Sequence, residues 1–310
     1  MAWSRCEWEW ARAQPAYSNV FEETPVPALS SLPAHPFDEA IALTHQGADT
    51  FAGHTSPAYW NMIGPFGGIS AALALNAVMQ HPSRLGEPVS LTINYASALT
   101  PGALTVSARA ARTNRSTQHW VVEVFQPNKV GVQETVLTAS AITAVRRDTW
   151  GVNDMPMPPV AAPHDVVRQT DHAPMEWLKR FELRMVTGKM PKTFDGVASA
   201  EASDSASLTQ VWLRDEPPRP LDFCALAAFA DVFYPRVYLR RPSLVPVGTV
   251  SMTVYFHASG ADLVACGSGY VLGQARGQVF RSGFFDQSAQ LWSASGTLLV
   301  TSLQIVYFKE

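Results

Sequence analysis

The hexapeptide SLTINY at residues 90–95 returns as SMTVYF at residues 251–256, at an offset of 161 positions. A second stretch, TVLTASAIT at residues 135–143, returns as TLLVTSLQI at residues 297–305, at an offset of 162. Two separate matches at nearly one offset indicate an internal duplication. Each half also carries an Ala- and Leu-rich, helix-like run before its first matched strand. The repeating unit is therefore one long helix followed by several strands.

The composition favours a large folded core and argues against several classes of partner. The chain has 310 residues, of which 47% are hydrophobic and 16% charged, and its net charge is −3. This much apolar material argues against disorder. No long basic run is present to neutralise phosphates, so we expect no nucleic acid partner.

Three cysteines, Cys6, Cys224 and Cys266, lack the spacing of a metal site and are odd in number, which favours a reducing compartment. The N-terminus shows no apolar signal segment, and no apolar run is long enough to span a membrane. We expect a soluble, cytoplasmic protein.

The pattern along the chain predicts two similar halves. Helices are expected at residues 69–80, after the turn signal GPFGG, and at residues 222–234, where Pro235 stops the run. Strands are expected in two groups, at residues 90–99, 103–113, 118–126 and 133–146, and at residues 248–258, 266–276, 279–285 and 296–308. Residues 288–295 are predicted to form a connecting turn.

The proline-rich stretch 149–174 is the best linker in the chain. The expected domains are therefore an N-terminal unit with an N-terminal arm at 1–148, the linker at 149–174, and a C-terminal unit at 175–310.

One buried helix wrapped by an antiparallel sheet, built twice, is a double hotdog, an α+β fold. From about residue 35 to its end, the chain resembles the acyl-CoA thioesterase II family. The segments that carry the resemblance are GPFGG (64–68), LTINY (91–95), ALAAFADVFYPRV (225–237), GTVSMTVYFH (248–257), GFFD (283–286) and LLVTSLQ (298–304). The resemblance implies an acyl-CoA substrate, a role in lipid metabolism and no metal or other cofactor.

Asp231 lies among apolar neighbours near the end of the second predicted helix. Asp222, at the start of that helix, fits an N-cap and needs no further role. Asp231 instead lies where the helix dipole disfavours a carboxylate. A solvent-facing aspartate in the last turn would explain it equally well. The resemblance implies that Asp231 is the catalytic aspartate, because the family carries one at this point.

Thr249 and Gln304 are the other two candidate catalytic residues. By the offsets of the two matches, their counterparts in the first half are Pro88 and Ile142, which lack their polar groups. Thr249 could be an ordinary strand residue, and Gln304 a satisfied core amide. The resemblance implies roles for both, since the family has a threonine eight residues before the strand-ending histidine, here His257, and a glutamine in its last strand.

Gly67 and Gly68 open the first predicted helix, where free N–H groups can bind an oxyanion. A turn that requires glycine is the plainer explanation. In hotdog enzymes the helix start of one unit faces the acidic residue of the other, so the chain would hold one working and one degenerate site. In that site Asp231 would polarise a water positioned by Thr249 and Gln304.

Two other functions remain open at this level. A hotdog hydratase or dehydratase would share the acyl-thioester substrate, but that family places a histidine five residues after its aspartate, where this chain has Arg236. A non-catalytic acyl-binding module is the other. The histidines of the linker, His164 and His172, have no further ligands nearby for zinc.

Strands with apolar residues on both faces predict a homo-oligomer, most simply a dimer. The N-terminal arm, with Trp3, Trp8 and Trp10, could instead cover part of the second face.

Overall fold

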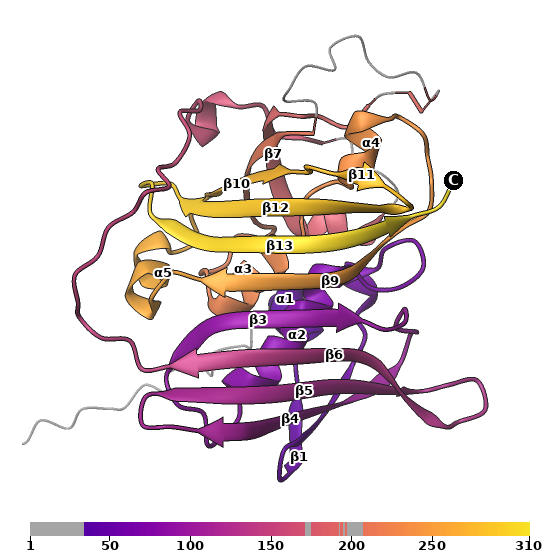
Figure 1. The fold of residues 1–310 in the computed structure, drawn as a ribbon, viewed down its shortest axis with the longest axis vertical. Helices are drawn as coiled ribbons and strands as arrows, with labels where there is room; N and C mark the ends of the chain where they lie inside the picture. The colour runs from indigo at the N-terminus through magenta and orange to yellow at the C-terminus, as the bar shows by residue number, and fades with distance from the viewer. Residues whose placement is uncertain (1–33, 171–174, 192, 195, 197–206) are drawn as a thin grey trace, which may run out of the picture. The chain divides into compact units, whose positions relative to one another are not determined.

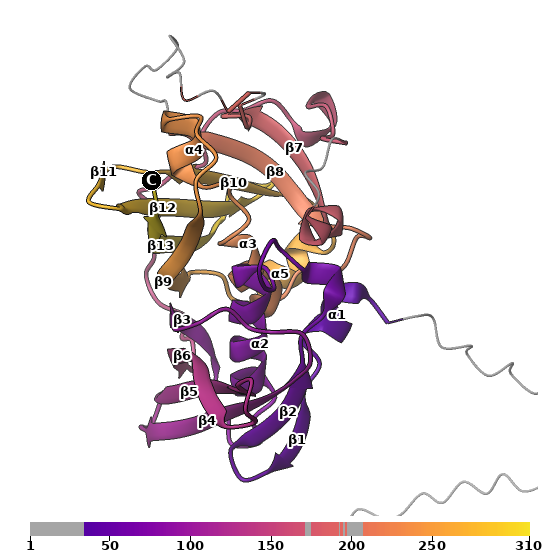
Figure 2. The same ribbon diagram turned by 90° about the vertical axis from the view of Figure 1, so that its right-hand side faces the viewer.

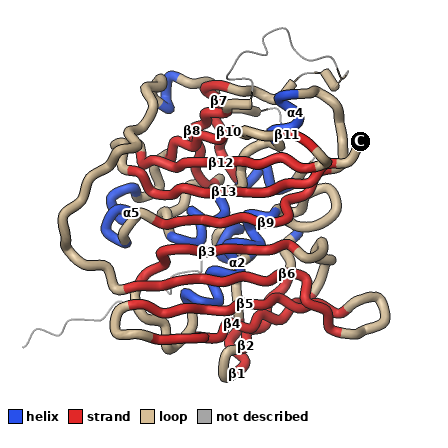
Figure 3. The backbone as a smooth tube through the Cα atoms, in the orientation of Figure 1, coloured by secondary structure: helices blue, strands red, loops and turns tan. Residues whose placement is uncertain are grey.

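One antiparallel sheet organises the part of the chain that the computed structural model describes, residues 34–170, 175–191, 193–194, 196 and 207–310. Within His35–Glu310, one compact unit, the sheet has 13 strands. The strands follow the order β1-β2-β4-β5-β6-β3-β9-β13-β12-β10-β8-β7, with β11 paired to β12 (Figures 1 and 3). The predicted arm with Trp3, Trp8 and Trp10 lies outside the described residues.

The strands of the first half are β1 (Thr44–Gly47), β2 (Thr50–His54), β3 (Glu87–Tyr95), β4 (Ala103–Thr113), β5 (Thr117–Pro127) and β6 (Gln133–Ala144). Those of the second half are β7 (Phe181–Thr187), β8 (Thr209–Asp215), β9 (Val247–Phe256), β10 (Val271–Arg276), β11 (Phe280–Arg281), β12 (Phe284–Ser293) and β13 (Leu298–Phe308). Counted outward from the centre of the sheet, the first half has the order β3-β6-β5-β4-β2-β1 and the second half β9-β13-β12-β10-β8-β7. Each strand of one half thus has a counterpart in the same place in the other half, as expected of a double hotdog.

Two helices, α2 (Gly67–Met79) and α3 (Phe223–Phe229), lie on one side of the sheet and pack against each other (Figure 2). Nearly every residue of α2 is buried, as its apolar sequence predicts. Asp222 caps α3 by accepting a hydrogen bond from the Ala225 N–H, which confirms its predicted role. The shorter helices are α1 (Pro36–Ala40), α4 (Arg236–Arg240) and α5 (Gly260–Cys266), with single turns at η1 (Pro57–Tyr59), η2 (Pro163–Asp165) and η3 (Glu176–Arg180).

The two halves join where β3 pairs with β9. Thr92 lies directly opposite Thr253, its partner in the sequence repeat, and their hydroxyl oxygens are 3.1 Å apart. Equivalent residues that face each other in this way mark a local two-fold axis through the seam. The two halves of the sequence repeat therefore form one continuous sheet rather than two separate sheets.

The strand register corrects one equivalence drawn from the sequence. In β3 the chain bulges at Val89, and in β9 it bulges at Val250, so the offset of 161 holds for these strands. Across the same pairs, Ile142 faces Ser90 while Ile305 faces Ser251, so β6 and β13 are related by 163 positions rather than 162.

The first-half counterpart of Gln304 is therefore Ala141, and the assignment to Ile142 was wrong. A slip of one residue moves every side chain of a strand to the other face. Ala141 is buried like Gln304, whereas Ile142 lies on the outer face.

Several predicted elements differ from the observed ones. Residues 288–293 belong to β12, so the turn predicted for 288–295 is wrong in its first part. The stretch predicted as a strand from residue 266 starts only at Val271, because α5 and its glycine end occupy the residues before it. The second helix ends at Phe229, five residues earlier than predicted. An opening strand was expected within residues 1–50, where β1 lies, but no strand was expected at β2 or β8, which are short strands near the two ends of the sheet.

The proline-rich segment covers part of the outer face of the sheet in the second half. Four residues of that face form a buried cluster: Trp212, Tyr270, Leu272 and Trp292. Met157, Val160 and Val166 pack on it, and the indole N–H groups of Trp212 and Trp292 donate to the carbonyls of Ala161 and Met155. The proline-rich segment thus covers one apolar patch on the outer face of the sheet within the same chain.

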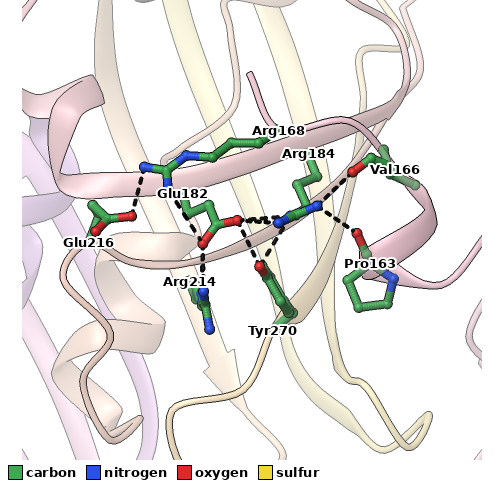
Figure 4. A network of polar contacts seen from close by, with 8 residues as sticks. All are labelled: Pro163, Val166, Arg168, Glu182, Arg184, Arg214, Glu216 and Tyr270. Carbon is green, nitrogen blue, oxygen red and sulfur yellow. Dashed lines mark hydrogen bonds and ion pairs between the residues drawn. The ribbon is translucent and has the colours of Figure 1, made fainter. Parts of the chain in front are cut away.

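A charged network fastens the same segment (Figure 4). The buried carboxylate of Glu182 pairs with Arg184 and Arg214 at 2.7 Å each, and Arg184 also donates to the carbonyls of Pro163 and Val166. Despite burial, hydrogen bonds from Tyr270 and the two arginines lower the pKa of Glu182 to about 2. The carboxylate of Glu182 therefore stays charged at any pH near neutrality.

Candidate active site

The start of α2 and the end of α3 approach each other so closely that only glycine fits. A Cβ atom on Gly67 would lie 2.6 Å from Oδ2 of Asp231, and one on Gly68 would lie 2.6 Å from the Ala228 carbonyl oxygen and 2.5 Å from the Phe66 ring. Such distances are far below van der Waals contact. The glycines thus let a helix start of the first half meet an acidic residue of the second half, as the sequence analysis expected.

Asp231 follows α3 by two residues and is largely shielded from solvent. Its Oδ1 accepts a hydrogen bond of 2.9 Å from the Gln304 side-chain amide, and the carboxylate also accepts one from the Gly68 backbone N–H. Burial raises the pKa of Asp231 to about 7, and the two hydrogen bonds oppose that rise. The carboxyl group is therefore held in place and titrates near neutral pH.

Gln304 lies buried in the middle of β13 and points at the end of α3. Besides Asp231, its amide nitrogen contacts the Ala230 carbonyl oxygen and the Met252 sulfur, both at 3.3 Å. The amide is thus a satisfied core group and at the same time a direct partner of Asp231. The two explanations that the sequence left open for Gln304 are compatible.

Thr249 shares the inward face of the sheet with Gln304. It stands three positions before Met252, which would normally place the two on opposite faces. The bulge at Val250 changes this, because Thr249 then lies opposite Val306, just as Met252 lies opposite Gln304. Within the described residues the Thr249 side chain makes no hydrogen bond, to Asp231 or to any other group. The structure thus brings together Asp231, Gln304, Gly67 and Gly68, and places Thr249 on their side of the sheet.

Tyr95, at the end of β3, is a site residue that the sequence analysis did not single out. Its hydroxyl donates a 2.9 Å hydrogen bond to the Gly67 carbonyl oxygen. Burial, and then the nearby charge of Asp231, raise the pKa of the Tyr95 phenol well above its usual value. A signal was present in the repeat, because the residue equivalent to Tyr95 is Phe256, so only one half carries a hydroxyl here.

An apolar cavity of about 20 Å³ lies beside α2, one turn beyond the glycines. Its lining includes Ile69, Leu73, Leu104 and Leu137, with Ser70 and Pro65 toward the helix start. The volume is about that of one water molecule.

The site holds no recognisable metal centre or second acid. No group of three or more His, Cys, Asp or Glu side chains in the described residues could hold a metal ion. Arg236, which stands where a hydratase would carry a histidine, is fully buried and donates to the carbonyls of Tyr234 and Ser207 and to the Thr209 hydroxyl. Its side chain is engaged in the core rather than turned to Asp231.

Both halves of the chain match family models. Residues 56–144 match the acyl-CoA thioesterase N-terminal domain, and residues 154–308 match the acyl-CoA thioesterase C-terminal domain. The chain belongs to the acyl-CoA thioesterase family. Family membership makes it a thioesterase enzyme of hotdog fold, and confirms the resemblance drawn from its sequence.

Solved structures agree on the fold. A conserved protein of unknown function with a hotdog fold from Alicyclobacillus acidocaldarius is 42% identical, with 89% of this chain and 99% of that chain covered and a TM-score of 0.81. A putative thioesterase II from Thermobifida fusca is 19% identical, with 90% and 99% covered and a TM-score of 0.73. An acyl-CoA thioesterase II from Mycobacterium marinum is 17% identical, with 88% and 98% covered and a TM-score of 0.65. No curated protein matches the chain.

None of the helices in the described ranges combines the length and the apolar character needed to cross a membrane.

Proposed function

We propose that this thioesterase hydrolyses acyl-CoA thioesters at the junction of α2, α3 and β13, with Asp231 as the general base. The observation that carries the proposal is the hydrogen-bonded pair of Asp231 and Gln304 at the start of α2. A carboxylate beside a helix start, in a largely apolar pocket, can take a proton from water while the helix start stabilises negative charge.

Titration of Asp231 suits this role. A general base works best when its pKa lies near the working pH, and burial raises the pKa of Asp231 to about 7. The carboxylate therefore accepts a proton more readily than a solvent-exposed aspartate. It is ionised above that pH and protonated below it, so activity should fall as the pH drops through this range.

The chemistry proceeds by addition of water. Asp231 removes a proton from a water held by Gln304 and Thr249, and the oxygen adds to the thioester carbonyl carbon. The tetrahedral intermediate then breaks its C–S bond, and the departing thiolate recovers the proton. A thiolate leaves readily, so a strong general acid is unnecessary.

The two glycines have separate tasks in this proposal. The Gly68 N–H holds Asp231. The Gly67 N–H is the first donor of α2 and bonds to no other group of the described residues, so we assign it to the oxyanion. The missing side chain at Gly67 also lets the thioester approach the backbone.

The experiment that tests the function is a panel of acyl-CoAs, from two to eighteen carbons, with the released thiol detected by a chromogenic disulfide. We expect the protein to release thiol from at least one of them, and Asp231→Asn to abolish most of that release. A protein that binds acyl-CoA but releases no thiol from the whole panel would be an acyl-binding module instead.

The remaining features stay predictions. They are the division at 1–148, 149–174 and 175–310, a cytoplasmic location, and a homodimer. Support for the dimer comes from the outer face of the sheet, where Tyr255, Leu303 and Ile305 are 46%, 55% and 41% exposed. The proline-rich segment packs on β8, β10 and β12 rather than on these residues.

A further inference from the structure

We propose that Tyr95 is a positioning residue for Asp231, and that it acts through the peptide group between Gly67 and Gly68. The inference rests on the proposed function only in taking Asp231 as the base. The hydrogen bonds themselves do not depend on it.

Two side chains act on opposite ends of one peptide group. The Tyr95 hydroxyl donates to the Gly67 carbonyl oxygen at 2.9 Å. The N–H of the same planar peptide group is that of Gly68, which acts on the Asp231 carboxylate and lowers its pKa, and a Cβ atom on Gly67 would lie 2.6 Å from Oδ2 of Asp231. Tyr95 and Asp231 thus hold the two ends of one rigid dipole. Because the peptide plane cannot twist, a bond at the carbonyl end fixes the direction of the N–H end.

Hydrogen bonds in a chain strengthen one another, by about 10–30% per bond in condensed phases. A donor on the Gly67 oxygen polarises the peptide and makes the Gly68 N–H a better donor. That bond favours the charged form of the carboxylate, against the effect of burial. Loss of the Tyr95 hydroxyl should therefore leave Asp231 protonated over a wider pH range.

Few other groups influence this carboxyl group. The elements packed around it, α2, α3, β9 and β13, carry no Asp, Glu, Lys, Arg or His. Of their other titratable groups, Cys224 interacts with Asp222 and Tyr255 points outward. Tyr307 pairs with Gly248 and, three positions after Gln304, lies on the opposite face of β13. On the segment that follows Asp231, Arg236 interacts with Tyr234. On β3, Tyr95 is the titratable group that feels the charge of Asp231.

The repeat supplies an independent observation. Phe256 occupies the equivalent place in the second half, is buried, and packs edge-on against Phe223 in α3. An aromatic ring is therefore enough for packing at this position. The hydroxyl occurs only in the half whose helix start faces Asp231, which is what a role in the site requires.

The test compares Tyr95→Phe with the parent protein, using Tyr255→Phe as the control. Tyr255 is a tyrosine of the same sheet on its outer face. Asp231 would be titrated directly by NMR with aspartate labelled at the carboxyl carbon, its signal identified by its loss in Asp231→Asn. We expect Tyr95→Phe to raise the Asp231 pKa by roughly 0.3–0.7 pH units, and Tyr255→Phe to leave it unchanged. An Asp231 pKa that stays or falls in Tyr95→Phe overturns the proposal.

A second variant covers the case in which Tyr95→Phe does not fold. Replacing Tyr95 by 3-fluorotyrosine keeps the ring and makes the hydroxyl a stronger donor, so the Asp231 pKa should fall. An unchanged or higher value counts against the relay.

The pH dependence of thioester hydrolysis should shift in the same directions as the titration. A titration that shifts in a protein that hydrolyses no thioester would leave the relay standing and reject the proposed function alone.

Discussion

A methyl group on Gly67 would lie 2.6 Å from Oδ2 of Asp231, and 3.5 Å from the Tyr95 hydroxyl. The backbone of one half and the acid of the other are thus in direct contact, with no room for a side chain. The site depends on this contact, because it brings a helix start to the carboxylate.

Gly67→Ala should push Asp231 away and disable the site. We expect a loss of at least tenfold in hydrolysis and a destabilisation of about 1–3 kcal/mol, typical of overpacking. The measurement is a rate assay beside a denaturant melt. Gly151→Ala is the control, because a Cβ there meets nothing within 4 Å. Full activity in Gly67→Ala would show that the contact is not needed.

Asp231→Asn should keep the fold and lose most turnover. The amide is nearly isosteric with the carboxyl group, so the packing around it should survive. Loss of a general base typically costs about 10²–10⁴-fold in rate. The exposed aspartate Asp154 gives a matched control, Asp154→Asn. Hydrolysis by Asp231→Asn close to that of the parent would remove Asp231 from the mechanism.

The same substitution should stabilise the protein at neutral pH. The folded pKa of Asp231, about 7, lies above its ordinary value of 3.8. The folded state therefore binds a proton that the unfolded state releases, and the parent loses stability as the pH rises from about 4 to 7. Asp231→Asn escapes this loss, by on the order of 1–4 kcal/mol above pH 7.

Denaturant melts at pH 4 and pH 8 measure this difference between the two proteins. Asp215 also has a raised pKa, about 7, from burial. Both proteins contain Asp215, so its effect cancels in the comparison. A stability difference that is equal at both pH values would contradict the raised pKa of Asp231.

Gln304→Ala should damage hydrolysis less than Asp231→Asn, because the amide positions the base and the water without taking a proton. It also removes a hydrogen bond that favours the carboxylate form, so activity should need a higher pH. A pH–rate profile shows both effects. Gln290→Ala, on the neighbouring strand β12, is the control. An unshifted acid limb in Gln304→Ala would show that the 2.9 Å contact has no electrostatic effect.

The sequence predicted the fold well because duplication is a long-range signal that does not depend on single residues. It predicted Asp231, Gln304 and the glycines as one group because the fold fixes which helix start faces which strand. It failed on the register of β13. The bulges at Val136 and Leu299 are themselves 163 positions apart, so they do not cause the error. The residues of β6 match those of β13 at 163, where Ile142 meets Ile305, about as well as at 162, and only the pairing with β3 and β9 distinguishes the two offsets.

Two further features escaped for a related reason. Tyr95 has the type of side chain that any strand can carry, and its role follows only from the contact with Gly67. Thr249 and Met252 share a face because of the bulge at Val250. Simple alternation along the strand would place them on opposite faces. Many residue types can bond to a backbone group, so such a contact cannot be predicted from the residue types alone.

The outer face of β9 and β13 should form the interface of a dimer. Leu303, Ile305 and Tyr255 lie together there and are partly exposed, while the proline-rich segment covers a different part of that side. Leu303→Glu should dissociate the dimer, because a buried carboxylate without a partner opposes association. Light scattering measures the mass, with Leu244→Glu as the control, since Leu244 is exposed in a loop. A parent protein with the mass of one 33.8 kDa chain at all concentrations would contradict the dimer.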